Sequence, residues 1–81
     1  MRIEVLYFAA AKDAAGRPSE FIELQTTQTA QQLLVSLIAK YPRLQKLAAQ
    51  VRIAVNEEFV TGDHSLQAGD VVALIPPVAG G

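Results

Sequence analysis

Apolar residues recur along the chain with two different periods, and the two periods predict the order of strands and helices. Five segments are rich in β-branched and aromatic residues, which favour strands. They are residues 3–8, 20–24, 51–55, 59–60 and 71–75. Residues 9–15 consist mainly of helix formers, and residues 30–40 have apolar residues at helical spacing. The predicted order is a strand, a short helix, a strand, the main helix and three further strands.

The main helix is predicted to begin after Thr29 and to end near Lys40. Thr29 and Gln32 have the spacing of a capping box, in which each side chain accepts a hydrogen bond from the other residue's backbone amide. Pro42 disfavours helix at the residue before it, and it can equally begin a second short helix. The predicted apolar face consists of Leu33, Leu34, Leu37, Ile38 and Tyr41.

Three further features of the strands and turns follow from the same pattern. Gly16 is expected to end the short helix in the left-handed conformation, and Asn56 predicts a hairpin turn between the third and fourth strands. Residues 20–24 are predicted to form an edge strand with their charged side chains pointing outward. Residues 71–75 carry no charge and are predicted to form a fully buried strand.

This order of elements predicts an α+β fold of the ubiquitin-like β-grasp type. In such a fold a mixed sheet of about five strands has one main helix packed across it, and the crossover connection is right-handed. We assign residues 1–75 to this domain and residues 76–81 to an extended C-terminal tail. The fold serves many functions, so it does not identify one.

Composition excludes several classes of function. The chain has 81 residues, a formal net charge of −1, a single histidine and no cysteine. Nucleic-acid binding requires a basic face. Thiol chemistry and cysteine metal sites require cysteine, and a single histidine argues against a histidine-based site. His64 is expected to be a solvated loop residue. No apolar stretch reaches membrane-spanning length, and we expect no signal peptide, because the chain starts directly with the first predicted strand. We expect a cytoplasmic protein that binds no nucleic acid, no membrane and no metal.

The last six residues are the candidate functional segment. Pro76 and Pro77 end the final strand because proline cannot donate a hydrogen bond to a sheet. If residues 76–81 are extended, they reach about 20 Å. Gly80 and Gly81 lack a Cβ atom, so they can carry the terminal carboxylate through a narrow channel into another protein's active site. An ordinary frayed terminus would also end in small residues, but a strand that leads directly into two prolines favours a functional tail.

The sequence resembles the MoaD family, the small subunit of molybdopterin synthase, over the whole chain. The features that carry this resemblance are the first strand running into an Ala-rich turn with Gly16, the segment Ala54-Val55-Asn56, the pattern Leu66-x-x-Gly69-Asp70-x-Val72 and, most specifically, Pro76-Pro77-Val78-Ala79-Gly80-Gly81.

The resemblance implies a sulfur carrier in molybdenum cofactor biosynthesis. A ubiquitin-activating-like adenylyltransferase is expected to use ATP and Mg²⁺ to adenylate the carboxylate of Gly81. Sulfur from a separate donor then converts it to a thiocarboxylate, which donates sulfur to precursor Z. This chain is therefore expected to bind no cofactor itself. The catalytic groups are expected on the large subunit, in a complex expected to be a heterotetramer.

The resemblance also assigns roles to individual residues. Gly81 is expected to carry the reacting carboxyl group. The residues that thread the tail into the partner are Pro76, Pro77, Val78, Ala79 and Gly80. An apolar docking patch for the large subunit is predicted at Phe8, Phe59 and Ile75, although Phe8 could instead be an ordinary core residue.

Three different functions stay open at the level of sequence. A thiamine-pathway sulfur carrier shares the fold and the Gly-Gly end. A ubiquitin-like modifier would use the same activated carboxyl group to acylate lysines. A β-grasp interaction module would make no covalent use of its C-terminus.

Overall fold

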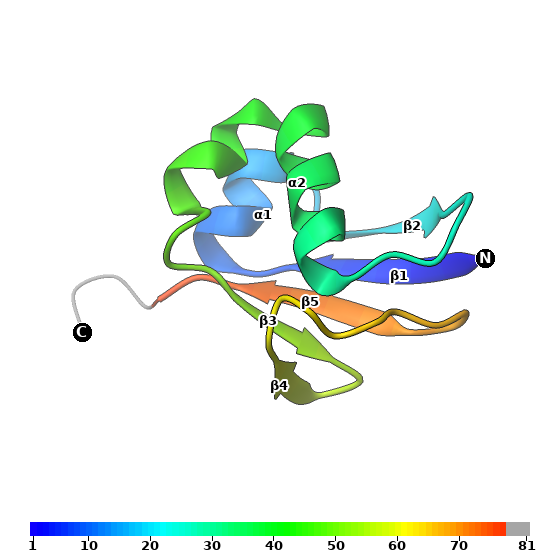
Figure 1. The fold of residues 1–81 in the computed structure, drawn as a ribbon. Helices are drawn as coiled ribbons and strands as arrows, with labels where there is room; N and C mark the ends of the chain where they lie inside the picture. The colour runs from blue at the N-terminus through cyan, green and yellow to red at the C-terminus, as the bar shows by residue number, and fades with distance from the viewer. Residues whose placement is uncertain (78–81) are drawn as a thin grey trace.

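The protein has a five-stranded mixed sheet with its helices on one face (Figure 1). The structure is a computed structural model that describes residues 1–77, so the predicted tail residues Val78, Ala79, Gly80 and Gly81 lie outside the described residues. The elements are β1 (Arg2–Tyr7), α1 (Ala9–Ala15), β2 (Ser19–Glu23), α2 (Ala30–Lys40), the 3₁₀ helix η1 (Pro42–Leu47), β3 (Arg52–Val55), β4 (Glu58–Val60) and β5 (Val71–Ile75).

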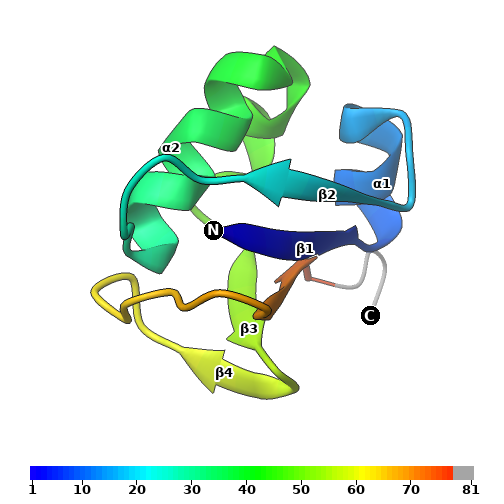
Figure 2. The ribbon, with the colours of Figure 1, turned by 90° about the vertical axis from the view of Figure 1, so that its right-hand side faces the viewer.

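The last strand lies in the middle of the sheet. The strand order is β2-β1-β5-β3-β4. β5 is parallel to β1, and every other neighbouring pair in this sheet is antiparallel. Figures 1 and 2 show β1 and β5 side by side below the helices. The predicted mixed sheet, with one main helix packed across it, is confirmed.

The hydrophobic core lies between the sheet and the helices. Every second residue of β1 and β5 points into it, and α2 covers it with the apolar face that its sequence predicts. Leu44 of η1 and Leu66 of the loop before β5 pack against the sides of this core. The largest fully buried side chains are Ile3, Val5, Leu33, Leu37, Leu44, Leu66, Val72 and Leu74.

Local signals in the sequence mark the ends of the helices. Gly16 ends α1 at a φ of 75°, in the left-handed region. Thr29 and Gln32 form both hydrogen bonds of the predicted capping box at the start of α2. α2 ends at Lys40, and Pro42 begins η1. The predictions at these positions are confirmed, because each depends on the conformation of only a few neighbouring residues.

The prediction that β5 is fully buried is wrong. Val72 and Leu74 are fully buried, but Val71, Ala73 and Ile75 are only partly buried. The helices cover one face of the sheet, so even a central strand has alternate side chains on the other face. We call this second face the open face of the sheet.

β2 is an edge strand, as predicted, and Glu23 is exposed, but the prediction that the charges of β2 point outward is wrong for Glu20. The Glu20 side chain is buried, whereas Phe21 is 64% exposed. Glu20 lies opposite Val5 in the β1–β2 register, and Val5 faces the core. Pairing with β1 therefore turns Glu20 inward and places Phe21 on the open face.

Candidate functional site

The tail leaves the body at the end of the central strand β5. Pro76 is buried and Pro77 is exposed, so the chain leaves the packed body between these two prolines. The N–H group of Phe8 donates a hydrogen bond of 3.3 Å to the Leu74 carbonyl. The base of the tail is therefore anchored beside the junction between β1 and α1. The remaining tail residues of the predicted site lie outside the described residues.

Phe8 lies at this junction, and its side chain is 46% exposed. Tyr7 is paired with Leu74 in the parallel register of β1 and β5, so the next step of that register places Phe8 beside Ile75. Ala9 follows with a φ of 48°, in the left-handed region. This turn redirects the chain from β1 into α1. The exposure of Phe8 shows that it is not an ordinary core residue.

An apolar row crosses the open face from β1 to β4. The strand registers place Leu6 opposite Ala73, Ala73 opposite Ala54, and Ala54 opposite Phe59. Together with Phe8 and Ile75 they form what we call the open-face patch: Leu6, Phe8, Ala54, Phe59, Ala73 and Ile75. Phe59 ends the row and is 59% exposed. All three residues predicted for docking therefore lie on one face. The sequence pattern did not identify Leu6, Ala54 and Ala73, although the alternation of β5 contained the signal.

Arg52 divides the patch. It lies opposite Ile75 in the register of β3 and β5, and its guanidinium carbon is 4.8 Å from the centre of the Phe59 ring. Phe8 and Ile75 are thus side by side. Phe59 lies two strands away, with the Arg52 guanidinium stacked on its ring. Stacking of this kind keeps an aromatic ring exposed without leaving it free of contacts.

A buried carboxylate lies on the helix-covered face. Glu20 accepts hydrogen bonds of 2.7 Å from the Tyr7 hydroxyl and 2.6 Å from the Tyr41 hydroxyl. Lys40 donates a further bond of 2.6 Å, and Arg17 one of 3.3 Å. The cluster joins β2 to β1 and to the end of α2. Its groups are paired with one another, so we assign it a structural role.

The electrostatics of this cluster are set by its hydrogen bonds. Burial alone raises the pKa of the Glu20 carboxyl, but the hydrogen bonds from Lys40, Tyr41 and Tyr7 outweigh it and hold that pKa below its ordinary value. The hydrogen bond to Glu20 raises the pKa of Lys40. Burial, and then the bond to Glu20, raise the pKa of Tyr7. At neutral pH the cluster holds an ionised carboxylate beside a cation.

The two aspartates after β4 accept hydrogen bonds within turns. Asp70 accepts a hydrogen bond of 3.0 Å from the Asn56 side chain and one of 2.8 Å from the Gln67 amide. Asp63 accepts a hydrogen bond from the Thr61 hydroxyl. His64 is exposed. Within residues 1–77, the acidic and histidine side chains form no group of three that could hold a metal. None of the helices in that range has the length and apolar character to cross a membrane.

The described residues form a ubiquitin-like β-grasp body whose central strand leads into Pro76 and Pro77. The sequence matches the ThiS family over residues 5–81. The chain belongs to this family.

Individual relatives agree with this assignment. The chain is 36% identical over 81 residues to the molybdopterin synthase sulfur carrier subunit of Arabidopsis thaliana, and the match covers all of this chain and 84% of that protein. The resemblance predicted from the sequence is confirmed. SAMP1 from Haloferax volcanii has a similar structure, with a TM-score of 0.87, 25% identity and full coverage of both chains. A protein–protein complex of subunits 1 and 2 of molybdopterin-converting factor from Helicobacter pylori contains a chain with a TM-score of 0.71, 26% identity and full coverage of both chains.

Proposed function

We propose that this protein is a sulfur carrier of molybdenum cofactor biosynthesis and that Gly81 carries the sulfur. Membership of the ThiS family and relatives that are themselves molybdopterin synthase sulfur carrier subunits support the proposal. The structural observation that carries it is the position of Pro76 and Pro77. They follow the central strand directly, so the tail starts from a strand that is paired on both sides.

The chemistry begins with activation of a poor electrophile. A carboxylate is negatively charged and has no good leaving group, so sulfur cannot replace its oxygen directly. An adenylyltransferase that uses ATP and Mg²⁺ would join an oxygen of the Gly81 carboxylate to the α-phosphorus and release pyrophosphate. The terminal sulfur of a persulfide then attacks the carbonyl carbon and AMP leaves. A thiol cleaves the resulting acyl disulfide, and the thiocarboxylate remains on Gly81.

Transfer takes place in the partner. The thiocarboxylated tail enters the large subunit of molybdopterin synthase, and its sulfur attacks precursor Z. Hydrolysis of the acyl–sulfur bond leaves the sulfur on the pterin and restores the carboxylate of Gly81. The catalytic groups for this step belong to the large subunit. ATP and Mg²⁺ belong to the activating enzyme, and this chain supplies only the sulfur and its position.

The reach of the tail limits where the partner can dock. Pro76 is held in the body, so the remaining residues, 77–81, span at most about 17 Å. The partner's active site must therefore lie close to the end of β5. The open-face patch borders this point through Phe8 and Ile75, and we assign it as the docking surface for the large subunit in a heterotetramer. The Helicobacter pylori complex of subunits 1 and 2 supports docking of this kind.

Intact-mass analysis tests the sulfur-carrier function directly. The protein is incubated with its cognate activating enzyme, ATP, Mg²⁺ and a persulfide donor. We expect one oxygen to be replaced by one sulfur, at the last residue. A variant extended by one alanine after Gly81 is the matched control and should stay unmodified by sulfur. An unchanged mass of the natural chain, with an enzyme that forms the acyl adenylate, would contradict the proposal.

A second candidate function is that of a protein modifier. The similarity to SAMP1 favours it, since a small archaeal modifier protein is among the proteins of similar structure. A modifier would transfer the activated carboxyl group of Gly81 to lysine side chains. Conjugates linked through an isopeptide bond to Gly81, found by mass spectrometry of cell extracts, would distinguish this function from sulfur transfer.

A thiamine-pathway carrier and a non-covalent interaction module would each give a different experimental result. A thiamine-pathway carrier would form the same thiocarboxylate, but it would support thiazole synthesis and would not support conversion of precursor Z. A β-grasp interaction module that makes no covalent use of its end would bind its partner equally well with an extra residue after Gly81.

A further inference from the structure

The outer edge of β4 is available for hydrogen bonding. β4 is the last strand in the order of the sheet, and within residues 1–77 no strand lies beyond it. A two-residue turn joins β3 to β4, and Val55 and Glu58 flank it as a pair. Residues that flank a two-residue hairpin turn exchange hydrogen bonds, and the next pair does not. The N–H and C=O groups of Phe59 therefore point away from β3.

The register on the other side of β3 leads to the same result. Asn56 donates a backbone hydrogen bond of 2.8 Å to the carbonyl of Val71 in β5. Alternate residues of β3 therefore bond to β5, and Ala54 is one of them. Phe59 lies opposite Ala54, so Ala54 is not its hydrogen-bonding partner.

A hollow with both polar and apolar lining residues lies beside this edge on the helix-covered side. Gly62 closes one end of the hollow, where its carbonyl accepts a hydrogen bond of 2.9 Å from the Gln31 amide. The approach is close, since a Cβ atom on Gly62 would lie 3.1 Å from the Cβ of Gln31. The apolar residues that line the hollow are Leu34, Ala48, Val51, Ile53, Phe59 and Val60.

Phe59 borders the hollow at the edge of the sheet, and the strand register places its side chain on the open face. Side chains of an extended segment alternate between the two faces of a sheet. One set would enter the hollow, and the other would lie along the Phe59 ring on the open face. The site therefore fits an extended segment with alternating side chains.

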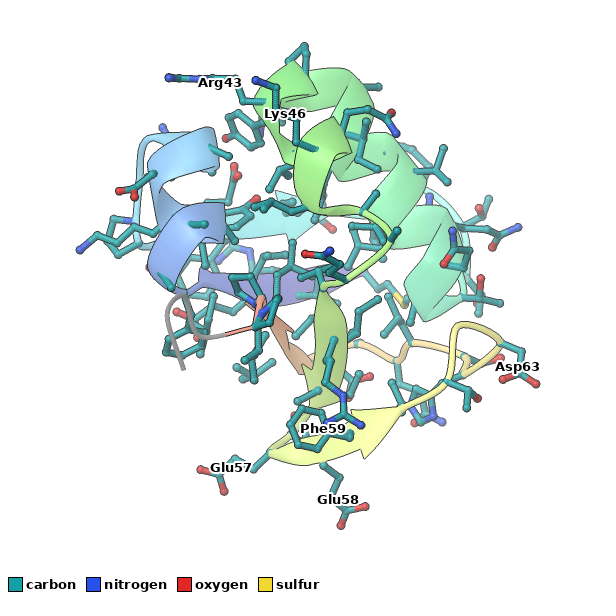
Figure 3. The ribbon with its side chains drawn as sticks, turned by 90° about the vertical axis from the view of Figure 1, so that its left-hand side faces the viewer. Arg43, Lys46, Glu57, Glu58, Phe59 and Asp63 are labelled. Carbon is teal, nitrogen blue, oxygen red and sulfur yellow. The ribbon has the colours of Figure 1, made fainter. Side chains whose placement is uncertain are left out.

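Carboxylates bracket the edge at both ends. Glu57 and Glu58 lie at the turn, and Asp63 lies beyond the other end of β4, as Figure 3 shows. The hydrogen bond from the Thr61 hydroxyl lowers the pKa of Asp63, so this side chain stays ionised. Arg52 is the basic residue among those that line the hollow, and it is stacked on Phe59. Acidic residues at an edge disfavour pairing with a second copy of the same edge, and they attract a basic segment.

We propose that β4 is a docking edge for an extended, lysine- or arginine-bearing segment of a partner protein. The segment pairs with the N–H and C=O groups of Phe59 as an added strand, and it places alternate apolar side chains in the hollow. This site is separate from the carboxyl chemistry of Gly81, so failure of the sulfur-transfer test would leave it unaffected.

Three short peptides test the proposal against the full-length, ¹⁵N-labelled protein. The first alternates valine and lysine, the second alternates valine and glutamate, and the third is the lysine peptide with methylated backbone nitrogens on one edge. We expect the lysine peptide to slow hydrogen exchange at the Phe59 amide and to shift the signals of Glu58–Val60. Loss of the hydrogen bonds or of the charge match should weaken binding by about tenfold. Equal binding of all three peptides, or no change at the Phe59 amide, would overturn the proposal.

Two substitutions of Phe59 distinguish the contribution of its backbone N–H group to binding from that of its side chain. Phe59→Pro removes the outward N–H group, and proline is tolerated on edge strands. Phe59→Ala retains that group and is the matched control. We expect Phe59→Pro to lose binding and Phe59→Ala to retain protection of the amide at position 59. If Phe59→Pro fails to fold, Glu58→Lys is the second test, and it should reverse the preference between the lysine and glutamate peptides. An unchanged preference in Glu58→Lys would overturn the role of charge.

Discussion

The ammonium group of Lys40 donates a hydrogen bond of 2.6 Å to the buried carboxylate of Glu20. The bond joins the last turn of α2 to the edge strand β2. Tyr7 and Tyr41 complete the coordination of the same carboxylate. An apolar residue at position 20 could not make these bonds, and the cluster therefore fixes β2 against the helix layer.

The first prediction concerns the stability of the fold as the pH falls. The folded state holds the pKa of Glu20 below its ordinary value of 4.5. The unfolded chain therefore takes up a proton first as the pH falls. The stabilisation by ionised Glu20 is fully present above about pH 4.5, and it is lost as the pH falls through the folded-state pKa. Urea unfolding between pH 2 and 7 should show this loss in the natural protein and a smaller one in Glu20→Gln. Parallel curves would contradict the prediction.

The second prediction concerns the alkaline side. The pKa of Lys40 is raised from 10.5, mainly by its bond to Glu20, and that of Tyr7 is raised from 10.0, mainly by burial. Both groups lose their protons more easily in the unfolded chain. Their contribution to stability is therefore present below about pH 10 and is lost as the pH rises further. Urea unfolding between pH 8 and 12 should show this loss, with Lys12→Met, an exposed lysine substitution, as a control that retains it.

The third prediction compares two alanines at the start of α1. Ala9 has a φ of 48°, a conformation that costs a residue with a Cβ atom about 1 kcal/mol. Ala10, the next residue, lies in the helix and is exposed. Ala9→Gly should therefore leave the free energy of unfolding equal or raise it by about 0.5 kcal/mol. Ala10→Gly should lower it by about 1 kcal/mol. Chemical denaturation of both variants checks the difference, and equal losses would show that Ala9 is not strained.

The fourth prediction concerns the open-face patch. Phe8→Ser removes an exposed ring beside the base of the tail, and it should weaken binding to the large subunit by about tenfold or more. Val35→Ser, on the outer face of α2, is the matched control because Val35 is also exposed, at 57%. Calorimetric titration with the large subunit should separate the two variants. Similar affinities would remove Phe8 from the docking surface.

The fifth prediction separates function from folding. Deletion of Gly81 should abolish sulfur transfer to precursor Z, because the proposed function requires the activating enzyme and the large subunit to act on the carboxyl group at that position. The core lies within residues 3–74, so the melting temperature should stay within about 1 °C of that of the full chain. A large loss of thermal stability would show that the tail has a structural role.

Much of the fold could be predicted because it depends on neighbouring residues. The cap of α2 needs Thr29 and Gln32, the end of α1 needs Gly16, and the hairpin turn begins at Asn56, where φ is 51°. The second left-handed residue, Glu57, was not expected, since glutamate has no local preference for that conformation. The candidate tail was recognisable for the same reason as the caps. Its prolines restrict the backbone and its glycines widen the conformations open to it, wherever these residues stand.

The sequence by itself determined the helices, the turns and the residues of the tail, because short-range geometry decides each of them. Only the tertiary structure decided which way a strand faces and which strand is its neighbour. Glu20 points inward because β2 pairs with β1, and Phe59 presents a free backbone edge because β4 is last in the sheet. Strand pairing joins residues far apart in the chain, so no pattern within one segment specifies it.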